Sequence, residues 1–323
     1  MLFWGGGGDI DMEKKDEQSA ASKKIAILFM LMSALGFSLM NLFVRLSGEM
    51  PTTSKSFGRN LVAFLVAFIF LLVSVVKERR RNESKQLDLI VHSLKTPKTL
   101  GLLLMRSGLG LVGILCNFYA LDHIQVAEAS VLNKTAPFFV LIFSLIFLKE
   151  KLSIKQIVSI LVAFLGVVLI TNPLGVGVGK GTYFAYCIAL LGGVAAGAAY
   201  TFVRLLGQVK VPGSLIICFF SAFSTLATLP SFLKNQSEMT SAQLLYLLLA
   251  GLFAAMGQYG ITYAYRFAPA RDVSIYDYFT VVFSALWSFI VLAEVPQWLA
   301  LLGALLIFVA ALINFMANRA RLH

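Results

Sequence analysis

The chain has 323 residues, of which 59% are hydrophobic and 13% charged, and its mean hydropathy is +0.83. Soluble domains carry roughly 25% charged residues, so the composition excludes an ordinary water-soluble protein. The net charge of +11 would suggest a nucleic-acid partner in a soluble chain. Here we expect none, because the basic residues are distributed as in a membrane protein.

Long apolar segments recur along nearly the whole chain. A bilayer core about 30 Å thick needs roughly 20 apolar residues per helix. The sequence therefore predicts an all-α integral membrane protein with ten transmembrane helices. These helices are expected at about 25–46, 53–76, 99–121, 125–148, 154–171, 182–206, 213–233, 243–265, 271–293 and 297–317.

The opening segment 1–24 is polar and glycine-rich, which predicts a cytoplasmic tail rather than a signal peptide. The glycine run 5–8 could be a translated ribosome-binding region, so translation could start at either Met1 or Met12.

The basic residues favour one side of the membrane. With the N-terminus in the cytoplasm, cytoplasmic segments hold about 20 of the 27 Lys and Arg, many in the tail and the loop 77–98. The opposite side holds about five, namely Arg45, Lys55, Arg59, Lys180 and Lys234. The positive-inside bias therefore predicts an inner-membrane protein with both termini cytoplasmic. The loop 77–98 is interpreted as an orientation signal, or as a contact with anionic lipid headgroups.

Cofactor signals are weak. Cys116, Cys187 and Cys218 stand singly in apolar stretches without a histidine partner nearby, so neither a disulfide framework nor a metal site is indicated. No GxxxxGK[ST] loop occurs, and ATP-driven pumping would need a separate subunit. We expect no cofactor.

The chain contains an internal repeat. Residues 118–150 align without a gap on 262–294, and residues 43–46 match 202–205. The most informative matches are polar: Ser130 with Ser274, Ser144 with Ser288, and Glu150 with Glu294. The predicted halves are 25–171 and 182–317. Five helices in each half would insert the second half upside down, which is a common architecture of secondary transporters.

Several motifs resemble the drug/metabolite transporter superfamily, specifically its EamA-type members. They are residues 147–153 followed by Gln156 and Gly166, the segment 57–60, and the segment 106–108. The resemblance covers nearly the full chain and implies ten helices around a central cavity and transport without ATP hydrolysis. Relatives carry amino acids, nucleoside-like compounds, vitamins and other metabolites. The second half departs from the pattern, because Arg106 aligns with Ala250 and helix 7 lacks an arginine comparable to Arg59.

Polar residues inside the apolar segments are the candidate substrate-binding residues. A charge near the bilayer centre costs about 2.5–3.5 kcal/mol and usually faces a partner or a water-filled cavity. Lys134 and Asp277 lie near the middle of the fourth and ninth helices, and Asn133 and Asp277 are repeat equivalents. The full set is Asn41, Arg106, Asn117, Asn133, Lys134, Tyr200, Gln258, Tyr263, Asp277 and Tyr278.

Structural roles compete with these assignments. Lys134 could simply pair with Asp277 or reach an interface, and Arg106 could anchor its helix end. Glu150 and Glu294 are expected to cap or pair locally. Tyrosines could stack on a planar ligand or lie at the interface. Pro137 should free the carbonyl of Asn133 within the fourth helix, next to water, protein or ligand.

These observations predict a secondary transporter of a small polar or amphoteric metabolite, either amino acid-like or nucleoside-like. The alternatives are a channel, a receptor or an integral-membrane enzyme, although no catalytic cluster is visible in the sequence. The expected partners are the small-molecule substrate and membrane lipids, and the sequence also allows a homodimer.

Overall fold

A computed structural model describes residues 7–80, 85–147, 153–171, 180–235, 239–267 and 274–320. Every regular element in these ranges is helical. The elements are α1 (Gly7–Leu46), α2 (Thr52–Arg80), α3 (Lys85–Lys95), α4 (Pro97–His123), α5 (Val126–Asn133), α6 (Ala136–Phe147), α7 (Ile154–Thr171), α8 (Lys180–Gln208), α9 (Gly213–Asn235), α10 (Ser241–Phe267), the 3₁₀ helix η2 (Ser274–Tyr278), α12 (Phe279–Leu292) and α13 (Trp298–Ala320).

Eight segments of the described chain are long and apolar enough to cross a membrane. They are Lys23–Leu46, Thr52–Glu78, Pro97–His123, Val126–Phe147, Gly181–Gln208, Gly213–Asn235, Ser241–Ile261 and Trp298–Ala317. Two shorter apolar helices are Ile154–Ile170 and Tyr276–Leu292. Large apolar side chains such as Ile69, Leu161 and Leu226 are exposed, as expected where helices face lipid. The protein is therefore a multi-pass membrane protein.

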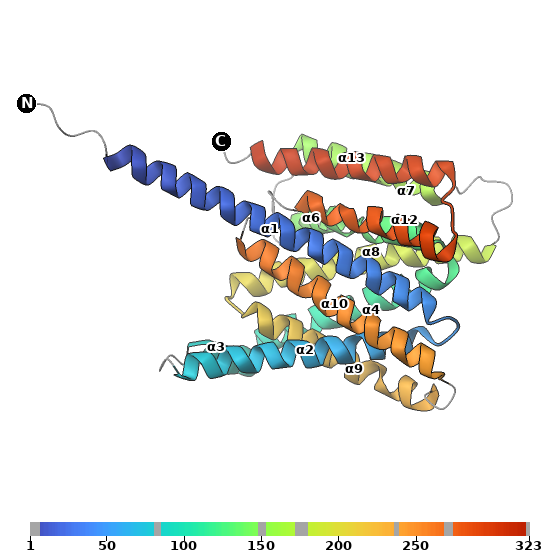
Figure 1. Cartoon of the computed structure of the whole chain (residues 1–323), viewed down its shortest axis with the longest axis horizontal. Helices are drawn as coiled ribbons and strands as arrows, with labels where there is room; N and C mark the ends of the chain where they lie inside the picture. The colour runs from blue at the N-terminus through green and yellow to red at the C-terminus, as the bar shows by residue number, and fades with distance from the viewer. Residues whose placement is uncertain are drawn as a thin grey trace, which may run out of the picture.

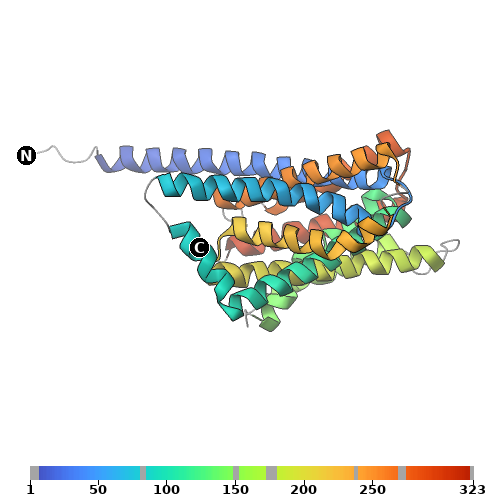
Figure 2. The same cartoon turned by 90° about the horizontal axis from the view of Figure 1, so that it is seen from below.

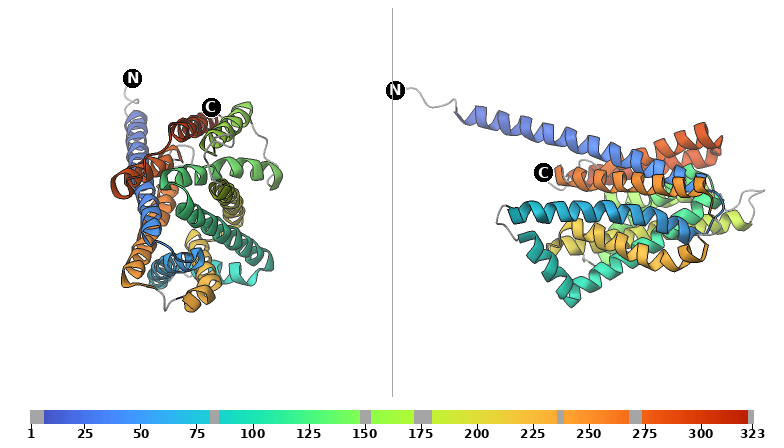
Figure 3. Two further views of the ribbon diagram at one scale, coloured as in Figure 1. Left: turned by 90° about the vertical axis from the view of Figure 1, so that its right-hand side faces the viewer. Right: turned by 60° about the horizontal axis from the view of Figure 1, so that its bottom comes forward.

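The long helices form one bundle with roughly aligned axes (Figure 1). α1 and α13 place both termini at the same end, and α8 starts from the opposite end to α1. We call the end that lacks the termini the far end. Short α3 is tilted against the long helices at the terminal end (Figures 2 and 3). The predicted loop 77–98 thus contains the end of α2 and all of α3, apart from residues 81–84, which lie outside the described ranges.

Early helices pack closely against late helices. A Cβ atom added to Gly36 of α1 would lie 2.7 Å from the backbone nitrogen of Gly257 in α10. A Cβ on Gly166 of α7 would lie 2.7 Å from the carbonyl oxygen of Gly303 in α13. α7 and α13 accordingly lie side by side along one edge of the bundle (Figure 1). Small residues permit this close approach, which supplies van der Waals contact where lipid removes the hydrophobic driving force.

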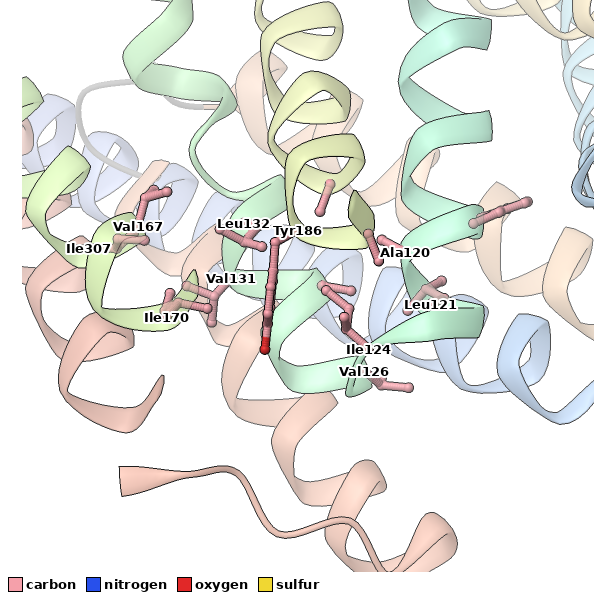
Figure 4. Packing of buried hydrophobic residues seen from close by; sticks show 14 of the residues in the cluster. Ala120, Leu121, Ile124, Val126, Val131, Leu132, Val167, Ile170, Tyr186 and Ile307 are labelled. Atoms are coloured by element: carbon pink, nitrogen blue, oxygen red, sulfur yellow. The ribbon is translucent and has the colours of Figure 1, made fainter. Parts of the chain in front are cut away.

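The largest apolar cluster surrounds the α4–α5 connection. Leu121, Ile124 and Leu132 meet Ile170 of α7 and Tyr186 of α8 there (Figure 4). This cluster joins several helices beside the cavity described below and so holds α5 in place.

Two predicted helices are interrupted. The segment 125–148 divides into α5 and α6 at Lys134 and Thr135, and Pro137 lies in the first turn of α6 rather than inside one continuous helix. The missing N–H of proline costs little in a first turn. The segment 271–293 begins with the 3₁₀ helix η2 before α12, and its residues 271–273 lie outside the described ranges. The predicted tail 1–24 is helical from Gly7 onward.

Candidate functional site

A cavity of about 120 Å³ lies among α1, α2, α4, α5, α8, α9, α10, η2 and α12. We call it the central cavity. Its wall consists of Phe37, Met40, Asn41, Arg59, Arg106, Gly110, Gly113, Ile114, Asn117, Phe118, Ser130, Asn133, Lys134, Ala196, Ala199, Tyr200, Phe220, Gln258, Ile261, Asp277 and Thr280. Such a mixture of apolar surface with a few converging polar groups is typical of a small-molecule site.

The two interrupted helices meet at the cavity wall. Lys134 Nζ donates to Asp277 Oδ2 at 2.6 Å, and the Tyr278 hydroxyl donates to the Lys134 carbonyl oxygen at 3.1 Å. The Thr280 hydroxyl donates to the Asp277 carbonyl oxygen at 2.7 Å. The other carboxylate oxygen of Asp277, Oδ1, is buried and has no hydrogen-bond partner among the described residues. The two helix interruptions thus place an ion pair at the cavity, in which Asp277 Oδ1 accepts no hydrogen bond from the described residues.

A chain of amides and hydroxyls crosses the wall beside this pair. Asn117 Nδ2 lies 3.4 Å from Asn41 Oδ1, and Asn41 Nδ2 donates to Ser130 Oγ at 3.1 Å. Ser130 Oγ in turn donates to Ser284 Oγ at 2.8 Å. The network links α4, α1, α5 and α12 and fixes the orientation of the two asparagines.

Two arginines form another part of the wall. Arg59 of α2 and Arg106 of α4 are only 3% and 6% exposed. Arg59 donates to Asn60 Oδ1, and the Arg106 guanidinium lies over the Phe220 ring at 3.9 Å from its centroid. Such stacking on an aromatic face attracts the cation.

The wall contains eight of the ten candidate residues proposed from the sequence: Asn41, Arg106, Asn117, Asn133, Lys134, Tyr200, Gln258 and Asp277. Tyr263 does not line it and instead stacks on Phe29 with ring centroids 5.5 Å apart. Tyr278 is buried behind the wall, where it bonds to Lys134.

Arg59, Phe220 and Thr280 line the cavity but were not among the candidates. The sequence places Arg59 among the basic residues opposite the termini, and it lies in the second turn of α2. The available signal was its place inside the predicted helix 53–76, two residues before the apolar run that starts at Leu61. Phe220 and Thr280 gave none, because an aromatic or a threonine in an apolar helix is ordinary.

The far end of the bundle carries a second group of charges. Arg45 Nη2 lies 3.0 Å from Glu294 Oε1, and Glu294 Oε2 accepts from Ser288 Oγ at 2.6 Å and from the Val126 backbone N–H at 3.2 Å. Gln125 Nε2 adds a bond to the Val295 carbonyl oxygen at 3.1 Å. Glu294 therefore pairs across the bundle as well as locally. Its repeat equivalent Glu150 lies outside the described residues.

Other buried charges are also paired. Lys55 donates to Asp122, and the Tyr186 hydroxyl donates to Glu128 Oε2 at 2.7 Å. The described residues include no cluster of three or more His, Cys, Asp or Glu able to hold a metal ion. The arrangement is suited to binding a polar or charged small molecule in a largely apolar protein.

Comparison with known proteins agrees with this architecture. The sequence profile of the EamA-like transporter family matches residues 24–172 and 183–316. The pseudopaline exporter of Pseudomonas aeruginosa is 28% identical over 90% of this chain and 95% of its own length. A riboflavin transporter of Rhizobium johnstonii is 25% identical over 92% of each chain. A crystal structure at 17% identity superimposes with a TM-score of 0.58, covering 91% of this chain and 98% of the other, which shows a shared fold. Because the profile matches two segments that together span most of the sequence, the chain belongs to the EamA-like transporter family and is a transporter rather than an enzyme.

Proposed function

We propose that the protein is a secondary transporter that moves a small polar or amphoteric metabolite, amino acid-like or nucleoside-like, across the cytoplasmic membrane by alternating access. The observation that carries the proposal is the central cavity, which has amides, hydroxyls and charges of both signs on its wall. A buried polar surface of this kind is costly in a membrane unless it serves a substrate or an ion.

The proposed architecture has ten spans in two inverted halves, 25–171 and 182–317, following the tail 1–24. The two shorter helices, Ile154–Ile170 and Tyr276–Leu292, would cross with the eight longer ones. The opposite directions of α1 and α8 in the bundle support the inversion (Figure 1). Transporters with inverted repeats bind substrate near the midplane, at discontinuous helices. Lys134 and Asp277 lie where two helices of this protein are interrupted, which supports a binding site there.

The names of relatives support a small-molecule cargo. One is named as an exporter of pseudopaline and others as transporters of riboflavin, so a single cavity architecture is associated with different cargoes. We place both termini in the cytoplasm, since they share one end of the bundle and the basic residues favour that side. The basic stretch around α3 would then face anionic lipid headgroups.

A channel is the second candidate, since a polar cavity could also conduct. Two measurements separate the two. A thermal-shift screen of the solubilised protein against metabolites identifies a ligand that stabilises the folded state. Counterflow of that ligand in proteoliposomes then tests the mechanism. A carrier gives saturable uptake that is accelerated by unlabelled ligand inside the vesicle, whereas flux that rises linearly with concentration and shows no such acceleration would contradict the proposal.

A further inference from the structure

We propose that Arg59 and Arg106 together bind a carboxylate or phosphate group of the substrate, at the α2–α4 wall of the central cavity. This inference rests on the proposed transport function and narrows the substrate class to anions or to zwitterions with an exposed acidic group.

The two arginines lack acidic partners. Within the described residues, no carboxylate oxygen lies within 4.0 Å of a side-chain nitrogen of Arg59 or Arg106. The Nε atom of each arginine is buried and has no hydrogen-bond partner there. Lys134 and Lys55, by contrast, each contact an aspartate. Buried charges in proteins are normally paired, so the unpaired arginines require another explanation.

The unpaired arrangement is costly as it stands. The two guanidinium groups repel one another, and their neutral contacts are the Asn60 side chain and the Phe220 ring. An anion in the cavity that contacts both guanidinium groups would offset this repulsion. The planar guanidinium fork matches carboxylate and phosphate oxygens in geometry.

The charge balance of the wall favours the same ligand. It contains three basic side chains, Arg59, Arg106 and Lys134, against one acidic side chain, Asp277. Asp277 is already engaged by Lys134, which leaves the arginine charges uncompensated. An anionic group is therefore the complementary cargo.

Gly110 provides the space that the Arg106 guanidinium occupies. A Cβ atom at this position would clash with Arg106 Nη1 and would lie 2.9 Å from the Phe220 ring. A Cβ at Gly108, one half-turn away on the same helix, would meet nothing within 4 Å. The local sequence of α4 thus seats the arginine head group against the aromatic ring at the cavity.

The first test measures thermal stabilisation of the purified protein by sodium phosphate, acetate and succinate, with sodium chloride at equal ionic strength as reference. We expect at least one of these anions to raise the melting temperature. Arg59→Gln and Arg106→Gln should each weaken its apparent affinity about tenfold or more, the usual scale of a lost charged hydrogen bond. Neither variant should melt lower than wild type without ligand, since each removes an unpaired buried charge. Lys98→Gln removes an exposed charge from α4 and should leave anion binding unchanged.

A second pair of variants tests whether the position of the Arg106 head group, and not only its charge, is needed for anion binding. Gly110→Ala keeps both arginines but displaces the Arg106 head group, so anion affinity should fall while the protein still folds. Gly108→Ala should bind like wild type. Equal anion affinity in the two alanine variants would contradict the proposed seat for Arg106.

Two outcomes would overturn the proposal. The first is stabilisation by none of phosphate, acetate and succinate, and the second is anion stabilisation that survives in the Arg59→Gln/Arg106→Gln double variant. In the first case, stabilisation by dihexanoyl phosphatidylglycerol would assign the arginines to a lipid headgroup. Saturable counterflow of a neutral metabolite in the double variant would preserve the transporter and reject the anion site. Intact anion binding by a protein that shows no flux would support the anion site and reject the transport function.

Discussion

Charged side chains are paired at the far end of the bundle, whereas those at the central cavity are only partly paired. At the far end Glu294 engages Arg45, Ser288 and the Val126 backbone, while Lys55 engages Asp122. At the cavity only Lys134 has an acidic partner, and Arg59 and Arg106 have none among the described residues. Complete pairing is what a closed protein interior requires, and incomplete pairing is what a binding site requires. The charges at the far end thus tie helix ends to one another, whereas the cavity keeps cationic groups without a counter-charge.

The first prediction concerns the most deeply buried pair. Asp122→Asn leaves the Lys55 ammonium, which is 0% exposed, without a counter-charge. We expect a loss of about 3–5 kcal/mol in the free energy of unfolding, the usual cost of breaking one side of a buried pair. The melting temperature in detergent should fall more than in any variant below. The double variant Lys55→Met/Asp122→Leu should recover most of the loss, and a single variant that melts like wild type would refute the pairing.

Asp277→Asn tests the pair at the cavity. The Lys134 and Asp277 side chains are 11% and 17% exposed, so water from the cavity can partly compensate the orphaned ammonium. We expect about 1.5–3 kcal/mol of destabilisation, the range for a hydrogen bond between charged groups. The rate of counterflow of the identified substrate should fall by more than the loss of folded protein explains. If Asp277→Asn destabilised as much as Asp122→Asn, the cavity would be dry and the comparison would fail.

Glu294→Gln tests the contacts that tie the helices together at the far end. The pair with Arg45 is partly exposed, and glutamine can keep some hydrogen bonds, so the stability loss should be about 1 kcal/mol. The far end of the bundle should open more easily, because the three bonds of Glu294 reach Arg45 of α1, Val126 of α5 and Ser288 of α12. A cysteine placed at Asn117 in a cysteine-free background should then react faster with an impermeant maleimide supplied at the far side. Unchanged labelling would show that these bonds do not hold that end closed.

Tyr278→Phe should have the smallest effect. It removes the 3.1 Å bond from the hydroxyl to the Lys134 carbonyl oxygen and keeps the ring contact with Phe308. We expect about 0.5–1.5 kcal/mol of destabilisation and little change in substrate affinity, since Tyr278 does not line the cavity. Tyr200→Phe is the matched comparison, because Tyr200 does line it. A larger loss of substrate affinity in Tyr278→Phe than in Tyr200→Phe would contradict the assignment of Tyr200, rather than Tyr278, to the cavity wall.

The candidate site shows how far sequence reasoning reaches. Lys134 and Asp277 stood out because a charge deep in an apolar segment is rare, and Asn41 and Asn117 fell on the same stripes as other polar residues. Arg59 was missed because it lies near the start of its apolar segment, where a basic residue is ordinarily a topological anchor. Tyr263 was included because a tyrosine can stack on a ligand, yet its partner is Phe29. A single chain pattern cannot distinguish a ring that faces a cavity from a ring that faces a neighbouring helix.

The sequence alone determined the membrane class, the positions of the apolar segments, the internal similarity and the family. These properties follow from hydrophobic length and local composition, which are readable within tens of residues. Only the tertiary structure decided which charges are paired. Lys134 meets Asp277 across 143 residues and Arg45 meets Glu294 across 249, so both contacts depend on how distant helices pack. The interruption at Lys134 and Thr135 was also decided there, since the ends of α5 and η2 meet at the cavity, where uncommitted backbone groups can be satisfied.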